Sequence, residues 1–154
     1  MLIRVNKLPS NCQNLMVANY ESGANWMGYP AGSEICGPSA GVKLVSYDQR
    51  WFAMESSDAG IKKYLSVDRY DDGFVKATSN YIGDNELFEF VVNPGMEGMN
   101  RFFLRSKLGN YLVVKPVYSG YDTIYQVAMA HDSFTGDEMS IVGCFNGYGG
   151  FMRF

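Results

Sequence analysis

The sequence contains few of the residues from which metal centres and nucleophilic active sites are built. Its 154 residues include one histidine, His131, and three cysteines that form no Cys-x-x-Cys pair. A transition-metal site needs several such ligands at close spacing. A catalytic site needs a nucleophile and an acid or base in defined geometry. We therefore expect no metal, no cofactor and no enzymatic activity, and we place His131 in a solvated turn.

Long apolar runs and clusters of basic residues are also missing. No stretch is long and apolar enough to cross a bilayer, so we expect no membrane insertion. The 13 Lys and Arg residues are scattered and are outnumbered by 16 Asp and Glu, which disfavours nucleic acid as a partner. An odd number of cysteines and the absence of an Asn-x-Ser/Thr sequon favour a reducing, cytoplasmic location. Secretion and a Cys12–Cys36 bridge remain open alternatives.

Glycine and aromatic residues, by contrast, are abundant. The 17 Gly, 11 Tyr and 10 Phe residues favour β-strands joined by tight turns. Two copies of a repeat of about 50 residues follow each other. Three pairs of segments match between the copies: RWFAMESS with NRFFLRSK, KYLSV with NYLVV, and ELFEFV with DEMSIV. The sequence therefore predicts an all-β protein with internal repetition.

A weaker third copy precedes these two. MLIRVN matches RWFAME with Ile3 opposite Phe52, NLMVA matches KYLSV, and AGVKLVSY matches NELFEFVV. Each copy contains four short segments of strand-like pattern, which gives twelve predicted strands. The side chains expected in the common core are Phe52, Met54, Leu65, Val75, Phe88 and Phe90, with the counterparts Phe102, Leu104, Leu112, Val127, Met139 and Ile141.

Twelve strands in three similar lobes predict a β-trefoil, a six-stranded barrel capped by three hairpins. The predicted lobes span residues 1–49, 50–99 and 100–144, and residues 145–154 form a C-terminal extension. The alternative is a βγ-crystallin-like double Greek key, suggested by YESGANWMG at residues 20–28. That segment is one residue longer than the usual crystallin pattern and occurs once, which favours the trefoil.

The predicted hairpin between the second and third strand of each lobe combines aromatic residues with amides or carboxylates. An aromatic ring offers an apolar face and the polar neighbours exchange hydrogen bonds, as a sugar surface requires. Asp71 and Asp72, with Asp68, lack the spacing of a calcium loop. The predicted sugar-binding residues are Asn25, Trp26, Tyr29, Tyr70, Asp71, Asp72, Tyr118, Tyr121 and Asp122.

Two blocks, FAMESSDAGIKKYLSVDRYDDGFVKATS and RFFLRSKLGNYLVVKP, resemble the amaranthin-like and fascin-like branches of the β-trefoil superfamily. The amaranthin resemblance implies a galactose- or N-acetylgalactosamine-binding agglutinin that acts as a homodimer. The fascin resemblance implies binding to actin filaments, but the chain lacks basic clusters, which favours the lectin. The Gln-x-Trp of ricin-type lectins is also missing. A trefoil protease inhibitor, which would act through a projecting loop, is a third possibility.

The chain ends in YGGFMRF, the sequence of Met-enkephalin extended by Arg-Phe. An opioid peptide needs a free amino group on its tyrosine, whereas Tyr148 is acylated by Gly147 and no dibasic processing site precedes it. Asn-Gly is a strong signal for a two-residue hairpin turn. We therefore predict that Asn146-Gly147 joins paired strands at 139–145 and 148–154, ordered within the subunit or at a homodimer interface.

Overall fold

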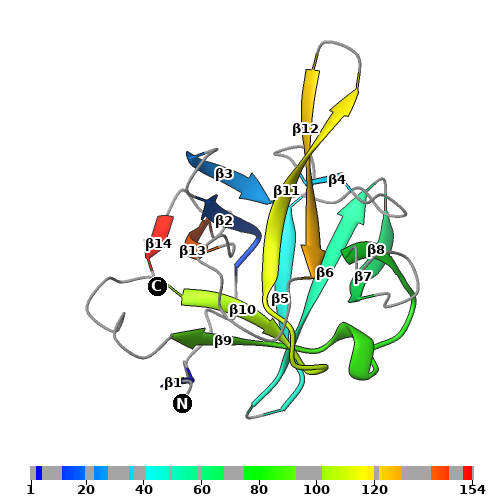
Figure 1. The fold of residues 1–154 in the computed structure, drawn as a ribbon. Coiled ribbons are helices and arrows are strands. Elements are labelled where there is room, and N and C mark those ends of the chain that lie inside the picture. The colour runs from blue at the N-terminus through cyan, green and yellow to red at the C-terminus, as the bar shows by residue number, and fades with distance from the viewer. Residues whose placement is uncertain are drawn as a thin grey trace.

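A computed structural model gives the fold of the chain (Figure 1). The residues that it describes are 3–4, 12–19, 23–27, 35–36, 41–48, 50–58, 60–67, 75–92, 102–119, 122–129, 140–145 and 151–153.

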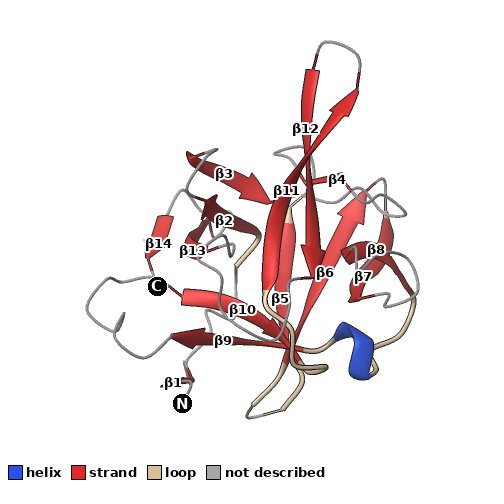
Figure 2. Cartoon of the chain, viewed as in Figure 1, coloured by secondary structure: helices blue, strands red, loops and turns tan. Residues whose placement is uncertain are grey.

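Fourteen strands and one short 3-10 helix make up this described part (Figure 2), so the prediction of an all-β protein is confirmed. The helix is η1 (Asp84–Glu86). The strands are β1 (Ile3–Arg4), β2 (Asn14–Asn19), β3 (Gly23–Met27), β4 (Ile35–Cys36), β5 (Val42–Ser46), β6 (Phe52–Asp58), β7 (Ile61–Val67), β8 (Val75–Ser79), β9 (Phe88–Val92), β10 (Phe102–Ser106), β11 (Leu112–Ser119), β12 (Asp122–Met129), β13 (Ser140–Phe145) and β14 (Phe151–Arg153).

Eleven of the strands form one curled antiparallel sheet. Its main path runs β3-β2-β13-β10-β9-β6-β7-β8, and β5 pairs with β6 beside this path. The sheet curls far enough for β5 to contact β2, the two being the ends of the series β2-β13-β10-β9-β6-β5. Gly41, just before β5, lies so close to β2 that a Cβ there would overlap the backbone oxygen of Gln13. The other three strands form a second sheet, β11-β12-β4.

The second and third repeats each supply four strands in the predicted order. They are β6 to β9 in one repeat and β10 to β13 in the other. Within them β6 pairs with β7 and β7 with β8, and β11 pairs with β12. An isolated bridge joins Arg105 of β10 to Tyr111, which directly precedes β11.

The predicted strand matching of the first repeat is wrong. The sequence pattern matches MLIRVN to RWFAME, but within the described residues β1 pairs with β9 alone, alongside Val91 and Val92. The strand whose pairing resembles that of β6 is β2, because β2 pairs with β13 and β3 in the way that β6 pairs with β5 and β7. The error has a physical origin, because alternating apolar residues mark any half-buried strand and do not say which neighbour it pairs with.

The core contains the predicted residues for which the structure describes the side chain. Phe52, Phe88 and Phe90 are buried, and the Phe52 ring centroid lies 4.6 Å from that of Phe90 and 6.5 Å from that of Phe88. Also buried as predicted are Met54, Leu65, Val75, Leu104 and Leu112. Phe102, Val127 and Ile141 belong to β10, β12 and β13, and Met139 lies outside the described residues.

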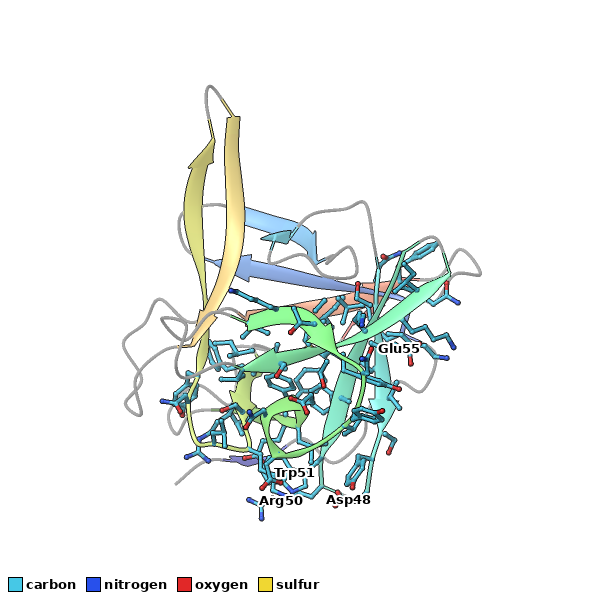
Figure 3. All side chains as sticks on the ribbon, turned by 90° about the vertical axis from the view of Figure 1, so that its right-hand side faces the viewer. Asp48, Arg50, Trp51 and Glu55 are labelled. Carbon is cyan, nitrogen blue, oxygen red and sulfur yellow. A yellow bond between two sulfur atoms is a disulfide. The ribbon has the colours of Figure 1, made fainter. Side chains whose placement is uncertain are left out.

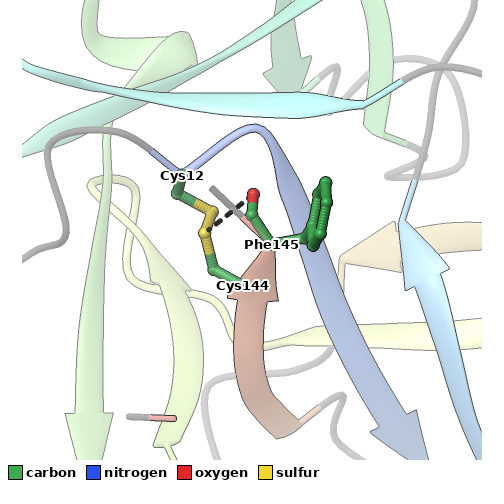
Figure 4. The surroundings of a disulfide bond; sticks show 3 residues. All are labelled: Cys12, Cys144 and Phe145. Atoms are coloured by element: carbon green, nitrogen blue, oxygen red, sulfur yellow. Dashed lines mark hydrogen bonds between the residues drawn. A yellow bond between two sulfur atoms is a disulfide. The ribbon is translucent and has the colours of Figure 1, made fainter. Parts of the chain in front are cut away.

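A disulfide bond joins Cys12, at the entry to β2, with Cys144 in β13 (Figure 4). The bridge that the sequence left open, Cys12–Cys36, is therefore not formed, and Cys36 lies in β4 of the other sheet. Both bonded cysteines are fully buried. The Gln13 N–H donates to the Phe145 carbonyl at 2.9 Å, next to the bridge. The disulfide thus links the chain just before β2 to β13, the strand that pairs with β2.

The C-terminal residues Phe151–Arg153 form β14, which pairs antiparallel with β13. The predicted register is wrong, because a two-residue turn at Asn146-Gly147 would place Tyr148 opposite Phe145. Instead Phe151 lies opposite Phe145, so that five residues, 146–150, separate the paired positions. The two residues of the Asn-Gly signal lie outside the described part of the chain.

Candidate functional site

The hairpin of β11 and β12 carries two of the predicted sugar-binding residues. It extends beyond the rest of the molecule at the top of Figure 1. Tyr118 pairs with Thr123, and Ser119 with Asp122, which leaves two residues between the strands. Successive register pairs alternate between the faces of a hairpin. Tyr118 with Thr123 therefore occupies one face of the tip, and Ser119 with Asp122 occupies the other.

Asn25 and Trp26 lie next to each other in β3, opposite Val17 and Met16 of β2. This hairpin belongs to the large curled sheet, whereas Tyr118 and Asp122 belong to the three-stranded sheet. The structure thus divides these four residues between two sheets. The other predicted sugar-binding residues, Tyr29, Tyr70, Asp71, Asp72 and Tyr121, lie outside the described residues.

A charged cluster around Trp51 was not predicted from the sequence. It begins with the turn between β5 and β6, where Asp48 Oδ1 accepts hydrogen bonds from the backbone N–H groups of Arg50 and Trp51, each at 2.8 Å. Figure 3 shows Asp48, Arg50 and Trp51 together at one end of the molecule, away from Glu55 on β6. The segment Asp-x-Arg-Trp carries the signal for this turn, because an aspartate commonly caps backbone N–H groups two and three residues later.

Cations cover the Trp51 ring. The Arg50 guanidinium carbon lies 4.5 Å from the ring centroid, and Lys107 Nζ lies 5.7 Å from it. Trp51 is consequently 9% exposed. A sugar needs an uncovered ring face to stack on. The Trp51 cluster therefore stabilises the fold and does not provide a ring face for sugar binding.

The buried carboxylate of Glu89 ties the same cluster to the central strands. Arg50 Nε lies 3.6 Å from Glu89 Oε2, and Arg105 NH1 lies 3.7 Å from Glu89 Oε1, while Glu89 is only 4% exposed. Lys107 Nζ pairs with Asp84 Oδ1 at 2.9 Å. Buried charges must be paired to be tolerated. Two cations, Arg50 and Arg105, therefore meet at Glu89 in β9, and a third, Lys107, pairs with Asp84 in η1.

The two backbone hydrogen bonds from Trp51 and Arg50 lower the pKa of Asp48 below its ordinary value of 3.8, and the charges of Lys107 and Arg50 act in the same direction. A lowered pKa in the folded state stabilises the fold above the unfolded pKa and ceases to do so as the pH falls through the folded pKa. Asp48 therefore contributes stability at neutral pH that is lost in acid below about pH 4.

We expect Asp48→Asn to flatten the acid limb of the stability profile. The amide keeps an oxygen that accepts the two N–H groups but has no charge to lose, whereas Asp48→Ala removes the acceptor as well. Urea unfolding at a series of pH values between 6 and about 2.5 should show a smaller loss in acid for Asp48→Asn than for the wild type. Asp48→Ala should be the least stable of the three near neutral pH. Identical acid limbs in the wild type and Asp48→Asn would contradict this account.

Two exposed tyrosines were also not among the binding residues predicted from the sequence. Tyr47, at the end of β5, is 56% exposed, and Tyr81, between β8 and η1, is 81% exposed. The Tyr81 N–H donates to Ser79 Oγ at 3.2 Å, and the Ser79 hydroxyl donates to the Tyr81 carbonyl at 2.7 Å. Neither tyrosine belongs to a hairpin tip of the predicted kind. Tyr81 is therefore a suitable reference residue for testing the hairpins.

No metal-binding group of three or more His, Cys, Asp or Glu residues occurs within the part of the chain that the structure describes. His131 and the aspartates at 68, 71 and 72 lie outside that part. The described residues contain no helix long and apolar enough to cross a membrane.

The chain matches no known protein-family model and no curated protein sequence.

Proposed function

We propose that the curled sheet and its hairpins form a β-trefoil. The support is a pairing rule that repeats around the molecule: the last strand of each lobe pairs with the first strand of the next. It holds for β5 with β6, for β9 with β10 and, from the last lobe back to the first, for β13 with β2. A second rule pairs the first and second strands of a lobe, β2 with β3 and β6 with β7. Such cyclic repetition is what a three-lobed barrel requires.

We further propose that the protein is a carbohydrate-binding lectin without catalytic activity, with galactose- or N-acetylgalactosamine-type glycans as ligands. The observation that carries the proposal is the projecting β11–β12 hairpin, whose tip holds Tyr118 and Asp122. A tyrosine ring packs against the apolar face of a sugar, and a carboxylate accepts hydrogen bonds from its hydroxyl groups. The eight register pairs between β11 and β12 hold the backbone of these two residues in place, which reduces the entropy lost on binding.

The two faces of the tip suggest how the sugar is held. In the register of the hairpin Tyr118 lies opposite Thr123, and Asp122 lies opposite Ser119. A single sugar that used both aromatic stacking and the carboxylate would sit across the tip. Such a shallow site binds one sugar weakly, so useful avidity requires several sites at once. We therefore include in the proposal a homodimer that presents more than one hairpin.

A glycan array at high protein concentration, followed by calorimetric titration of the best ligand, tests the lectin proposal. Tyr118→Ala and Asp122→Asn should each weaken binding about tenfold, the effect of losing one good polar or stacking contact. Tyr81→Ala, an exposed tyrosine outside the hairpins, is the matched control and should bind as the wild type does. Trp26→Ala tests the β3 site separately.

The outcomes separate the site from the function. If Tyr118→Ala and Asp122→Asn both bind normally, the hairpin tip is not the site, although the protein remains a lectin. An array without any binding, together with co-sedimentation with actin filaments, would replace the lectin by the fascin-like alternative. Inhibition of a protease panel by the wild type but not by a hairpin variant would favour the inhibitor alternative.

A further inference from the structure

Both ends of the chain form strands in similar places. The strand β9 shows this for the N-terminal end. The first residue of β9, Phe88, pairs with Phe52 of β6. At its end, β9 pairs with β1, through Val92 with Ile3 and Val91 with Arg4. Val91 also pairs with Phe103, and Phe88 with Ser106, both of β10. Because β10 occupies one side of β9, β6 and β1 share the other side.

The same arrangement recurs at β13. Its first residues pair with β10, and its last residues, Gly143 to Phe145, pair with β14. The opposite side is occupied by β2 throughout. In the second and third lobes, therefore, the first strand (β6 or β10) pairs with the beginning of the fourth strand (β9 or β13). A terminal segment of the chain (β1 or β14) pairs with the last residues of that fourth strand.

In the first lobe the corresponding place lies beside the end of β5. Here β6 pairs along the whole of β5, and β2 contacts the other side. Among the described residues, no strand pairs with Val45 or Ser46 on the side of β2. Exposure agrees with this difference, because Ser46 is exposed and Tyr47 is 56% exposed, whereas Val91 and Val92 of β9 are 1% and 7% exposed.

The backbone beside this place is positioned to accept a strand. The Tyr47 N–H donates to the Trp51 carbonyl at 3.1 Å, so the backbone groups of Tyr47 face the β6 side. In an antiparallel pair these groups alternate in direction from one residue to the next. The N–H and C=O of Ser46 therefore point away from β6. We name residues 45–47 the β5 edge.

We propose that the β5 edge binds an extended segment of a partner protein as an additional antiparallel strand, and that this segment combines an apolar residue with a basic one. The two segments that fill the equivalent places have this composition: Ile3–Arg4 in β1 and Phe151–Arg153 in β14. Strand addition of this kind takes its affinity from main-chain hydrogen bonds and its specificity from side chains.

Side chains around the β5 edge fit such a segment. The exposed Tyr47 ring offers an apolar contact, and the exposed carboxylate of Asp48 follows it directly. The nearby cations already have partners, since Arg50 lies on Trp51 and near Glu89, and Lys107 pairs with Asp84. The lowered pKa of Asp48 keeps this carboxylate charged in mild acid as well as at neutral pH. A basic side chain of the incoming segment would therefore meet a charged acceptor.

The test uses the full chain and a synthetic peptide with the sequence of residues 148–154, acetylated and amidated, because its FMR portion already fills the equivalent place beside β13. Amide NMR shifts and calorimetric titration follow the binding. The expected result is one-to-one binding with shift changes at residues 45–47. The same peptide with Met152→Pro, which breaks the pattern of backbone hydrogen bonds, should not bind.

Two protein variants sharpen the test. Ser46→Pro deletes the one N–H group of the β5 edge that faces away from β6 and leaves the β5–β6 pairing its donors, so the peptide should bind about tenfold more weakly. Asp48→Asn should reduce the preference for the peptide over its Arg153→Gln form. Shift changes at residues 143–145, which would indicate exchange with β14, would overturn the proposal. So would undiminished binding to a folded Ser46→Pro variant or equal binding of the Met152→Pro peptide, and the peptide comparison needs no protein variant to fold.

Discussion

Replacing both Cys12 and Cys144 by serine is expected to lower the free energy of unfolding by about 5 kcal/mol. The bridge spans a sequence separation of 132 residues, and in the chain-entropy view a loop of that length restricts the unfolded chain by about this amount. For a domain of this size the melting temperature should fall by roughly 10–20 °C. Thermal unfolding and urea titration of the double variant and the wild type measure both quantities.

Cys36→Ser is the control for the disulfide prediction, since Cys36 lies in the other sheet and takes no part in the bridge. It should leave the Cys12–Cys144 bond intact in a peptide map under non-reducing conditions. Reduction of the unfolded wild type, followed by refolding in reductant, should reproduce the stability of the double serine variant. Equal stability of the oxidised wild type and the double variant would contradict the prediction.

The location of the bridge adds a structural expectation. Cys12 and Cys144 fasten β2 to β13, the contact through which the end of the chain meets its beginning. Without the bridge, the amide groups of β2 and β14 should exchange with solvent faster than those of β6 and β9, because local opening starts where the fewest constraints remain. The reducing, cytoplasmic location stays a prediction. The disulfide argues against it, since such bonds persist mainly in oxidising compartments.

The strands β6–β9 and β10–β13 could be predicted because the two sequence repeats show the same strand pattern. Phe52 and Phe102 begin equivalent strands, and Leu65 and Leu112 are buried at equivalent places. Glu89 is instructive, because it is a charged residue in a strand whose five residues are all buried. The sequence gives no sign that Arg50, from the β5–β6 turn, and Arg105, from β10, would converge on it, since such convergence depends on the tertiary fold.

The first lobe and the tail show what sequence patterns leave undetermined. The alternation of apolar residues around Ile3 is compatible with two roles for β1, a strand of the barrel or a strand added at an edge. The observed pairing of Ile3 with Val92 distinguishes between them. At the tail, the Asn146-Gly147 signal described local turn preference, whereas the observed register places Phe151 opposite Phe145. Of the candidate sugar site, the sequence predicted the hairpin that holds Tyr118 and Asp122. It did not predict that pairing would assign them to different faces.

Phe88→Ala is expected to lower the free energy of unfolding by 3–5 kcal/mol, about the cost of removing a buried aromatic side chain from a core. Phe88 is fully buried and pairs with both Phe52 of β6 and Ser106 of β10. The alanine would leave a cavity at a position where β6, β9 and β10 meet. Urea unfolding measures the change, and Ile61→Ala is the matched control, because that side chain is 55% exposed and should change the stability by no more than about 0.5 kcal/mol.

A double-mutant cycle identifies which ring contact carries this core. The Phe52 ring lies 4.6 Å from Phe90 but 6.5 Å from Phe88, and aromatic pairs gain about 0.5–1.5 kcal/mol beyond burial when their rings are close. Coupling between Phe52 and Phe90 should therefore exceed coupling between Phe52 and Phe88, with leucine used at each position so that the variants fold. Equal coupling in the two cycles would contradict this expectation, and coupling near zero in both would mean that burial alone stabilises these rings.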